Sequence, residues 1–225
     1  MNTRKYPLIN GQYYHIINRS IAGFKIFNSE SDFDRMANML DVYRYIDFDY
    51  KYSRFTDLEP TLQLEILATL KQSSQLYAEI VAYCIMPTHI HLLLKQSSEN
   101  GTTKYMAKVL NSYSRYFNTT HKRVGPLWSG HFKNVPVNND EQLLHLTRYI
   151  HLNPVSAGLI EKPENWQHSS YRRYITESSD EDFLSDFHQL LDITPKSYQK
   201  FVNDQKSYQR DLAIIKHQLI EDYTG

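Results

Sequence analysis

Two histidines one residue apart, His89 and His91, are the first candidates for chemistry in this chain of 225 residues. They lie where residues 76–85 and 90–96, rich in aliphatic side chains, predict two strands joined by a short break. Side chains alternate between the two faces of a strand, so both imidazoles point to the same side. Two imidazoles on one face can bind a metal ion as a pair. The alternative is two polar residues on a half-exposed strand, because a bare His-x-His is common.

A phenol and an amide four residues apart, Tyr149 and Asn153, are the second candidates. They fall in a stretch that predicts a helix, where positions i and i+4 share one face, and His145 lies one turn earlier. The amide oxygen of Asn153 is a hard ligand for a cation, and the phenol could approach a group that this cation polarises. Alone, the tyrosine is more often a packed aromatic residue, and an asparagine before Pro154 is more often a helix cap. Together with the histidine pair, they assemble a nucleophile and a three-ligand metal site.

Length and composition indicate one globular domain with an appendage, or two small domains. Apolar residues make up 41% of the chain and aromatic residues 13%, which suffices for a core. No apolar run approaches the ~20 residues of a membrane span, and the first residues lack the hydrophobic segment of a signal peptide. The single cysteine, Cys84, excludes an internal disulfide and is expected to be a buried, inert thiol. We therefore expect a cytoplasmic protein without a membrane partner.

The charged residues are unevenly distributed, although the formal net charge is zero. No acidic residue occurs between Glu99 and Asp140, whereas acids gather in residues 30–59 and 177–192. Basic residues in this interval are interleaved with aromatic ones, a pattern that suits a phosphate backbone with bases stacked on rings. The alternative is a solvated helix face beside an ordinary core. The basic side chains concerned are those of Lys104, Lys108, Arg115, Lys122, Arg123 and Lys133.

The elements that must position these residues follow from periodicity and turn residues. The predicted order, strand–helix–strand–strand–helix–strand–helix, is typical of a split βαβ or ferredoxin-like α+β fold, an antiparallel sheet with helices on one face. Residues 47–59 are expected to be irregular. The other expected elements are strand 13–18, a helix from Ser29 or Ser31 to about residue 45, helix 61–73, helix 104–121 capped by Thr102 or Thr103, strand 132–137, and a helix from Asn139 to about residue 152 that Pro154 ends.

Five motifs, in order along residues 10–175, resemble those of the REP-associated tyrosine transposases, within the single-tyrosine HUH transposase superfamily. Residues 86–94, Met-Pro-Thr-His-Ile-His-Leu-Leu-Leu, resemble the His-hydrophobic-His signature. Residues 148–155, Arg-Tyr-Ile-His-Leu-Asn-Pro-Val, resemble the Tyr-Ile-His-x-Asn-Pro-Val segment. The other three are Tyr-His-Ile-x-Asn-Arg at 14–19, Leu-Trp-x-Gly-x-Phe-Lys at 127–133, and Trp-x-x-Ser-Ser-Tyr at 166–171.

This resemblance implies an HUH endonuclease fold and a DNA strand-transfer reaction. His89, His91 and Asn153 would hold one Mg²⁺ or Mn²⁺ ion, which neutralises and orients the scissile phosphate. Tyr149 would attack that phosphate of single-stranded DNA, leaving a 5′-phosphotyrosine link and a free 3′-OH. The implied partner is a single-stranded DNA hairpin of the REP-like palindrome type, and relatives act as monomers or dimers, which leaves a homodimer open. Candidate DNA contacts are Lys104, Lys108, Arg115, Lys122, Arg123, Lys133, Arg148, Arg172 and Arg173.

The sequence departs from the family's pattern at two positions. Thr88 stands where the family often carries Asn, His or Glu, and its side chain is expected to face away from the two histidines. Asn153 is one methylene shorter than the glutamine of related enzymes, so the metal or the helix must sit closer. Tyr113 and Tyr116 are rival nucleophiles, ranked lower because neither has a ligand-type partner placed as Asn153 is.

Two other functions stay open. One is a nucleic-acid-binding module that keeps the fold without the chemistry; the other is a metal-dependent phosphoesterase that activates water, with Tyr149 merely structural.

A tyrosine needs help to lose its proton, since the phenol of an unperturbed tyrosine titrates near pH 10, and His145 and His151 are the only suggestions for a base. Residues 1–175 are expected to form the catalytic domain, and residues 176–225 a helical extension without catalytic residues.

Overall fold

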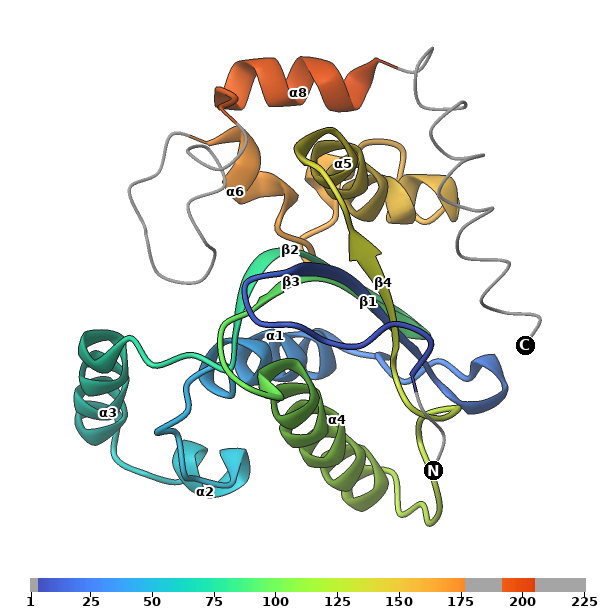
Figure 1. The fold of residues 1–225 in the computed structure, drawn as a ribbon. Helices are drawn as coiled ribbons and strands as arrows, with labels where there is room; N and C mark the ends of the chain where they lie inside the picture. Colours follow the sequence, from blue (N-terminus) through green and yellow to red (C-terminus); the bar gives the residue numbers. More distant parts are fainter. Residues whose placement is uncertain (1–3, 177–191, 205–225) are drawn as a thin grey trace.

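A four-stranded antiparallel sheet forms the centre of the chain in the computed structural model, which describes residues 4–176 and 192–204. The strands lie in the order β2-β3-β1-β4 (Figure 1), and each neighbouring pair is antiparallel. Their bounds are β1 Tyr13–Arg19, β2 Ala78–Met86, β3 His89–Gln96 and β4 Lys133–Val137. The predicted α+β class and ferredoxin-like order are confirmed.

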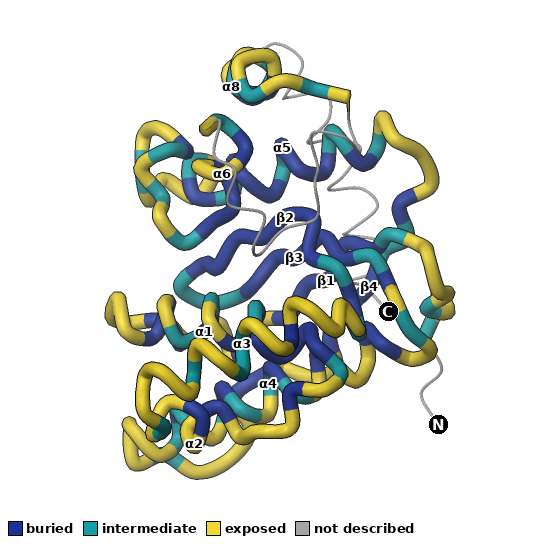
Figure 2. The backbone as a smooth tube through the Cα atoms, turned by 90° about the vertical axis from the view of Figure 1, so that its left-hand side faces the viewer, coloured by how far each residue is buried: buried dark blue, intermediate teal, exposed yellow. Residues whose placement is uncertain are grey.

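Helices cover both faces of the sheet, so the expectation of helices on one face was wrong (Figure 1). α1 (Glu30–Val42) and α4 (Gly101–Thr120) pack on one face, and α5 (Asp140–Ser156) packs on the other. The reason is that both faces are apolar: in β3, Leu92 belongs to the core under α1 and α4, and Leu93 to the core under α5. Figure 2 shows β2 and β3 buried between the two helical layers.

A second helical group lies beyond α5 on the same side of the sheet. α8 (Pro195–Asn203) packs against both α5 and α6 (Tyr171–Ile175) there. In the described residues, no helix is both long enough and apolar enough to cross a membrane. Outside this group, a short helix interrupts the segment that we expected to be irregular. The remaining bounds are η1 Ile21–Gly23, α2 Tyr52–Thr56, α3 Pro60–Ser73 and η2 Pro163–Asn165.

The helix starts follow local hydrogen bonding. Ser29, one of the two predicted caps, is the N-cap of α1 and forms a capping box with Asp32. α4 begins at Gly101, three residues before the predicted start, and its N-cap is Asn100 with φ of 56° rather than a threonine. The early start requires glycine, since a Cβ at Gly101 would lie 2.0 Å from the carbonyl oxygen of Tyr77.

Pro154 lies inside α5, which continues to Ser156, so the prediction that it ends the helix was wrong. A proline has no N–H to donate to the carbonyl four residues earlier, here that of Ile150. The side-chain Nδ2 of Asn153 lies 3.5 Å from this carbonyl oxygen and donates to the Tyr149 carbonyl at 2.9 Å. The asparagine therefore supplies a donor where the proline removes one.

Candidate active site

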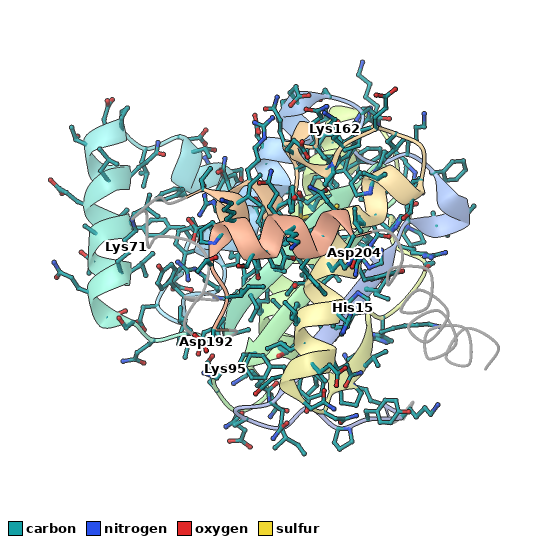
Figure 3. All side chains as sticks on the ribbon, turned by 90° about the horizontal axis from the view of Figure 1, so that it is seen from above. His15, Lys71, Lys95, Lys162, Asp192 and Asp204 are labelled. Atoms are coloured by element: carbon teal, nitrogen blue, oxygen red, sulfur yellow. The ribbon has the colours of Figure 1, made fainter. Side chains whose placement is uncertain are left out.

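Three histidines lie together on the face of the sheet that α5 covers. His89 and His91 come from β3, and His15 comes from the adjacent β1. Ile17 is paired with His91 across the two strands, and residues two apart share a face, which brings His15 to the same side. The ring atoms His15 Nε2 and His91 Nδ1 are 3.0 Å apart, and the ring centroids of His89 and His91 are 4.9 Å apart. Figure 3 shows His15 beside α5.

The Tyr149 side chain, on α5, lies against two members of this histidine group. Its ring centroid lies 5.8 Å from that of His91 and 5.9 Å from that of His15, edge-on to both. Ile17 and Val135 pack against the tyrosine ring from the sheet. The fold thus brings together a tyrosine and two histidines that are far apart in the sequence.

Hydrogen bonds define how the two histidines of β3 are presented. His91 uses Nδ1 toward His15, and His89 uses Nδ1 toward the Thr88 hydroxyl at 2.8 Å. The expectation that Thr88 faces away from the histidines was therefore wrong, because its hydroxyl turns back onto the neighbouring ring. When Nδ1 carries the proton in both rings, each Nε2 has a lone pair for a metal ion. Such outer partners commonly orient metal-binding histidines.

The three imidazoles are neutral at pH 7. Burial lowers the pKa of His15 to about 3. Burial, together with the positive charge of Arg19, lowers the pKa of His89 to about 4. The pKa of His91 lies well below its usual range, chiefly through burial and then through the neighbouring His89 and His15. Neutral rings are the form that binds metals, so burial keeps these histidines competent as ligands.

Asn153 is the predicted third ligand, and its amide follows Tyr149 by one turn on α5. Among the described residues, no group of three or more His, Cys, Asp or Glu side chains is arranged to hold a metal ion. A divalent ion at the histidine pair would therefore need a neutral oxygen. The Nδ2 of Asn153 is committed to backbone carbonyls, which fixes the amide orientation and leaves Oδ1 as its acceptor atom. By donor type, two neutral imidazoles and one amide oxygen could serve as ligands for one divalent ion.

Comparison with known proteins places this chain in a family. Residues 9–153 match the family model described as "Transposase IS200 like". The chain belongs to the IS200-like transposases. It is 30% identical over 120 residues to a protein of Haemophilus influenzae that bears the name REP-associated tyrosine transposase, an alignment covering 48% of this chain and 68% of that protein. This relationship assigns it to the REP-associated members.

The fold of this transposase is similar to that of a solved REP-associated tyrosine transposase bound to a REP hairpin. The TM-score is 0.54, with 14% sequence identity, and the match covers 79% of this chain and 87% of the other. At this identity the likeness concerns the fold.

The two suggestions for a general base lie away from the histidine group. The His145 ring packs edge-on against Phe201 of α8, with centroids 5.3 Å apart. His151 is fully buried, and both its ring nitrogens are used, toward the hydroxyls of Tyr198 and Ser170, each at 2.7 Å. His151 therefore serves to join α5 to its neighbours in this transposase.

The rival tyrosines lie on the opposite side of the sheet. Tyr113 is fully buried and donates its hydroxyl hydrogen to the Ile26 carbonyl. Tyr116 donates to a carboxylate oxygen of Asp32 at 2.9 Å. Burial raises the pKa of both phenols, and Asp32 raises it further. Both observations favour Tyr149 as the nucleophile.

The predicted DNA contacts divide between two sides of the transposase. Lys104, Lys108 and Arg115 are on α4, across the sheet from Tyr149. Lys122 and Arg123 follow α4. Arg123 is engaged in its own loop, since it donates to Asn118 Oδ1 and to the carbonyls of residues 125 and 126. The basic interval is thus largely a feature of the surface opposite the histidines.

Lys133 is the member of that interval on the histidine side. It is paired with Ile17 on β1, so its side chain shares the face of His91. Arg172 and Arg173 are exposed on α6, where Arg172 donates to the Glu164 carbonyl at 2.7 Å.

Arg148 was predicted to contact DNA, and its position in the structure contradicts that prediction. Its side chain is fully buried, its guanidinium donates to the Asp204 carbonyl, and it lies 4.8 Å from the Phe201 ring centroid. Burial against α8 leaves it no surface to offer a phosphate in this arrangement.

Sequence reasoning missed His15 and Arg19. Alternation along residues 13–19 would have put both on one face, but the pairing of β1 with β3, which places them beside His91 and His89, is a long-range feature. Arg19 is exposed and paired with His89 across the strands, so it adds positive charge at the edge of the site.

Proposed function

We propose that this transposase is a metal-dependent single-stranded DNA endonuclease and strand transferase with Tyr149 as nucleophile. The observation that carries the proposal is the position of the Tyr149 ring, whose centroid is 5.8 Å from that of His91. The same α5 helix presents Asn153 one turn later, with its amide oriented by backbone carbonyls. The candidate nucleophile and the candidate third ligand thus lie one turn apart on the helix that covers the histidine pair.

In the first step, the Tyr149 phenolate oxygen attacks phosphorus, and the bond from phosphorus to the 3′ oxygen breaks. The 3′ oxygen takes a proton and leaves as a free 3′-OH, while the 5′-phosphate stays on the tyrosine. The 3′-OH of another end reverses the step and releases the phenol, so joining needs no external energy source. An Mg²⁺ or Mn²⁺ ion held by His89, His91 and Asn153 would supply charge neutralisation and orientation of the scissile phosphate.

The substrate that we propose is single-stranded DNA carrying a hairpin, of the kind that the solved REP-associated relative binds. Arg19 and Lys133 provide positive charge on the histidine side and suit the strand that reaches Tyr149. Other parts of the DNA would be contacted by the exposed lysines and arginines of α4, of the following loop and of α6.

The test uses a labelled single-stranded hairpin oligonucleotide from the gene's own flanking DNA, incubated with Mn²⁺ or Mg²⁺ and resolved on denaturing gels. We expect a metal-dependent protein–DNA adduct that disappears in Tyr149→Phe and persists in the matched control Tyr116→Phe. His89→Ala is expected to lose the adduct as well.

Other outcomes identify the competing functions. Cleavage without an adduct would mean that water is the nucleophile and that the chain is a phosphoesterase. Binding to a panel of hairpins without cleavage of any would indicate a non-catalytic binding module. Light scattering of the protein–DNA complex would show whether one or two copies act.

A further inference from the structure

A cavity of about 690 Å³ lies between α4 and the segment that joins α1 to α2. We call it the α1–α4 groove and define it by Arg35, Asp49, Tyr50, Lys51, Arg115 and Tyr116. It is on the side of the sheet that α1 and α4 cover, whereas Tyr149 is on the other side. Its size falls within the roughly 300–1,000 Å³ of ligand pockets. The groove is therefore separate from the candidate active site.

The charge of the groove is positive. Arg35, Lys51, Lys108 and Arg115 line it, against the one carboxylate of Asp49 among the lining residues. Lys108 also donates to the Phe48 carbonyl at 3.1 Å, which holds its ammonium group at the groove wall. Such a surface favours an anionic ligand.

Arg35 points to a phosphate more specifically. Its guanidinium carbon is 4.3 Å from the Tyr116 ring centroid and 5.1 Å from that of Tyr52. The Arg35 side chain is only half-buried and lines the groove, although its Nε is enclosed and has no hydrogen-bond acceptor among the described residues. A ligand in the groove would therefore meet the outer part of the guanidinium group. A phosphate oxygen is the acceptor that guanidinium groups bind best.

Aromatic rings complete the groove. Tyr50 lines the groove and is 42% exposed, so its ring is accessible to a ligand. Tyr116 offers a second ring, fixed by its hydrogen bond to Asp32. Cationic grooves with exposed aromatic rings bind single strands, because bases stack on the rings while phosphates meet the cations.

We infer that the α1–α4 groove binds a single-stranded segment of the DNA substrate, away from the scissile phosphate. Arg35, Lys51 and Arg115 would contact phosphates, and a base would stack on Tyr50. The inference rests on the proposed function for the identity of the nucleic acid. It explains why the basic residues of α4 lie across the sheet from Tyr149.

The test measures binding by fluorescence anisotropy in EDTA, so that no cleavage occurs. Two oligonucleotides share one hairpin: one has single-stranded flanks of about 16 nucleotides, the longest site size of a typical single-strand-binding module, and the other has trimmed flanks. We expect Lys51→Gln/Arg115→Gln to weaken binding of the flanked form about tenfold and to reduce the salt slope by about 0.7 for each phosphate that is no longer neutralised. Tyr50→Ala is expected to weaken it about fivefold or more.

The matched control is Lys25→Gln/Arg54→Gln, which removes two exposed cations outside the groove. It is expected to keep wild-type affinity, and the trimmed oligonucleotide is expected to bind all variants alike. Lys51 and Arg115 are exposed, so their replacement leaves the fold intact; Arg35→Gln is then added to test the contact of the half-buried guanidinium. Equal affinities of the groove and control variants for the flanked form would overturn the inference.

A different result would overturn the proposed function. If wild-type protein forms no tyrosine adduct in the presence of metal, the proposed function is wrong, even if the groove binds the flanks. If adducts form while the groove variants bind the flanked oligonucleotide with wild-type affinity, the groove inference is wrong and the proposed function is supported.

Discussion

His15 and His91 share a direct imidazole–imidazole hydrogen bond, with 3.0 Å between His15 Nε2 and His91 Nδ1. Both rings are almost completely buried. A neutral pair can share this bond in two ways. If His91 donates, its Nε2 has a lone pair for a metal ion; if His15 donates, His91 carries its proton on Nε2 and cannot bind one. His15 acting as acceptor therefore selects the tautomer of His91 that can bind a metal.

Replacing His15 with Phe is expected to lower Mn²⁺ affinity about 10- to 100-fold, the usual effect of removing such an outer partner. His15→Gln, whose amide oxygen can accept the same hydrogen, is expected to recover part of that affinity. Isothermal titration with Mn²⁺ measures the affinities, and the ¹⁵N shifts of His91 in the metal-free protein report its tautomer. His121→Phe, an exposed position, is the control. Wild-type affinity in His15→Phe would show that His15 is only a packing residue.

Tyr198 and Tyr171 make a matched pair for testing the attachment of α8. The Tyr198 hydroxyl lies 2.7 Å from His151 Nδ1 and donates to the Thr147 hydroxyl at 3.0 Å. The Tyr171 hydroxyl is buried with no hydrogen-bond partner among the described residues. Tyr198→Phe leaves buried groups without their partner and is expected to lower the free energy of unfolding by about 1–3 kcal/mol. Tyr171→Phe is expected to be neutral or slightly stabilising. Urea denaturation of both variants checks this, and equal changes would contradict it.

Gly101→Ala is expected to destabilise the fold by about 2 kcal/mol or more, because the new methyl group would overlap the backbone of Tyr77. Thr103→Ala, in the same first turn but exposed, is the control and is expected to change stability by less than about 0.5 kcal/mol. Thermal melts of the two variants decide. An unchanged melting temperature in Gly101→Ala would mean that the start of α4 shifts at little cost.

Stability is expected to fall as the pH drops from 7 to 5. Burial lowers the pKa of His151 to about 3, whereas an unfolded histidine titrates near 6.5. Between these values the unfolded state binds more protons, so protonation favours unfolding, and the stabilisation present above pH 6.5 decreases on acidification. For one such histidine the decrease at pH 5 is about 2 kcal/mol. Urea midpoints at the two pH values measure it, and equal midpoints would refute the assignment.

The sequence predicted the strand–helix order, the positions of the two histidines and the helix of Tyr149, because periodicity and local motifs determine these. It also predicted a buried Cys84, which is fully buried in β2. Pairing between distant strands is not encoded locally, so His15 was missed even though its strand was predicted. The same limit placed Arg148 among the DNA contacts, since its burial depends on α8, some fifty residues later.

The predicted end of the Tyr149 helix was wrong because a side-chain amide supplies a hydrogen-bond donor where a backbone N–H is missing. Pro154 predicts a helix end by its own chemistry, and only the Asn153 amide explains why α5 continues. The α1–α4 groove was beyond prediction as well, because Arg35 and Arg115 are eighty residues apart. The extension at 176–225 was predicted to be helical; α8 fits that prediction, and residues 177–191 and 205–225 lie outside the described part.

The attachment of α8 to α5 has a consequence for synthesis on the ribosome. A growing chain presents its N-terminal parts first. The sheet strands and the helix of Tyr149 emerge well before Tyr198 and Phe201, which pack against that helix from 47 or more positions downstream. A nascent chain can therefore expose every residue of the candidate active site while Tyr198 and Phe201, which pack against the helix of Tyr149, are still inside the ribosomal exit tunnel. The packing of α8 against α5 therefore forms only after residues 198–201 have left the ribosome, later than the strands that carry the histidines.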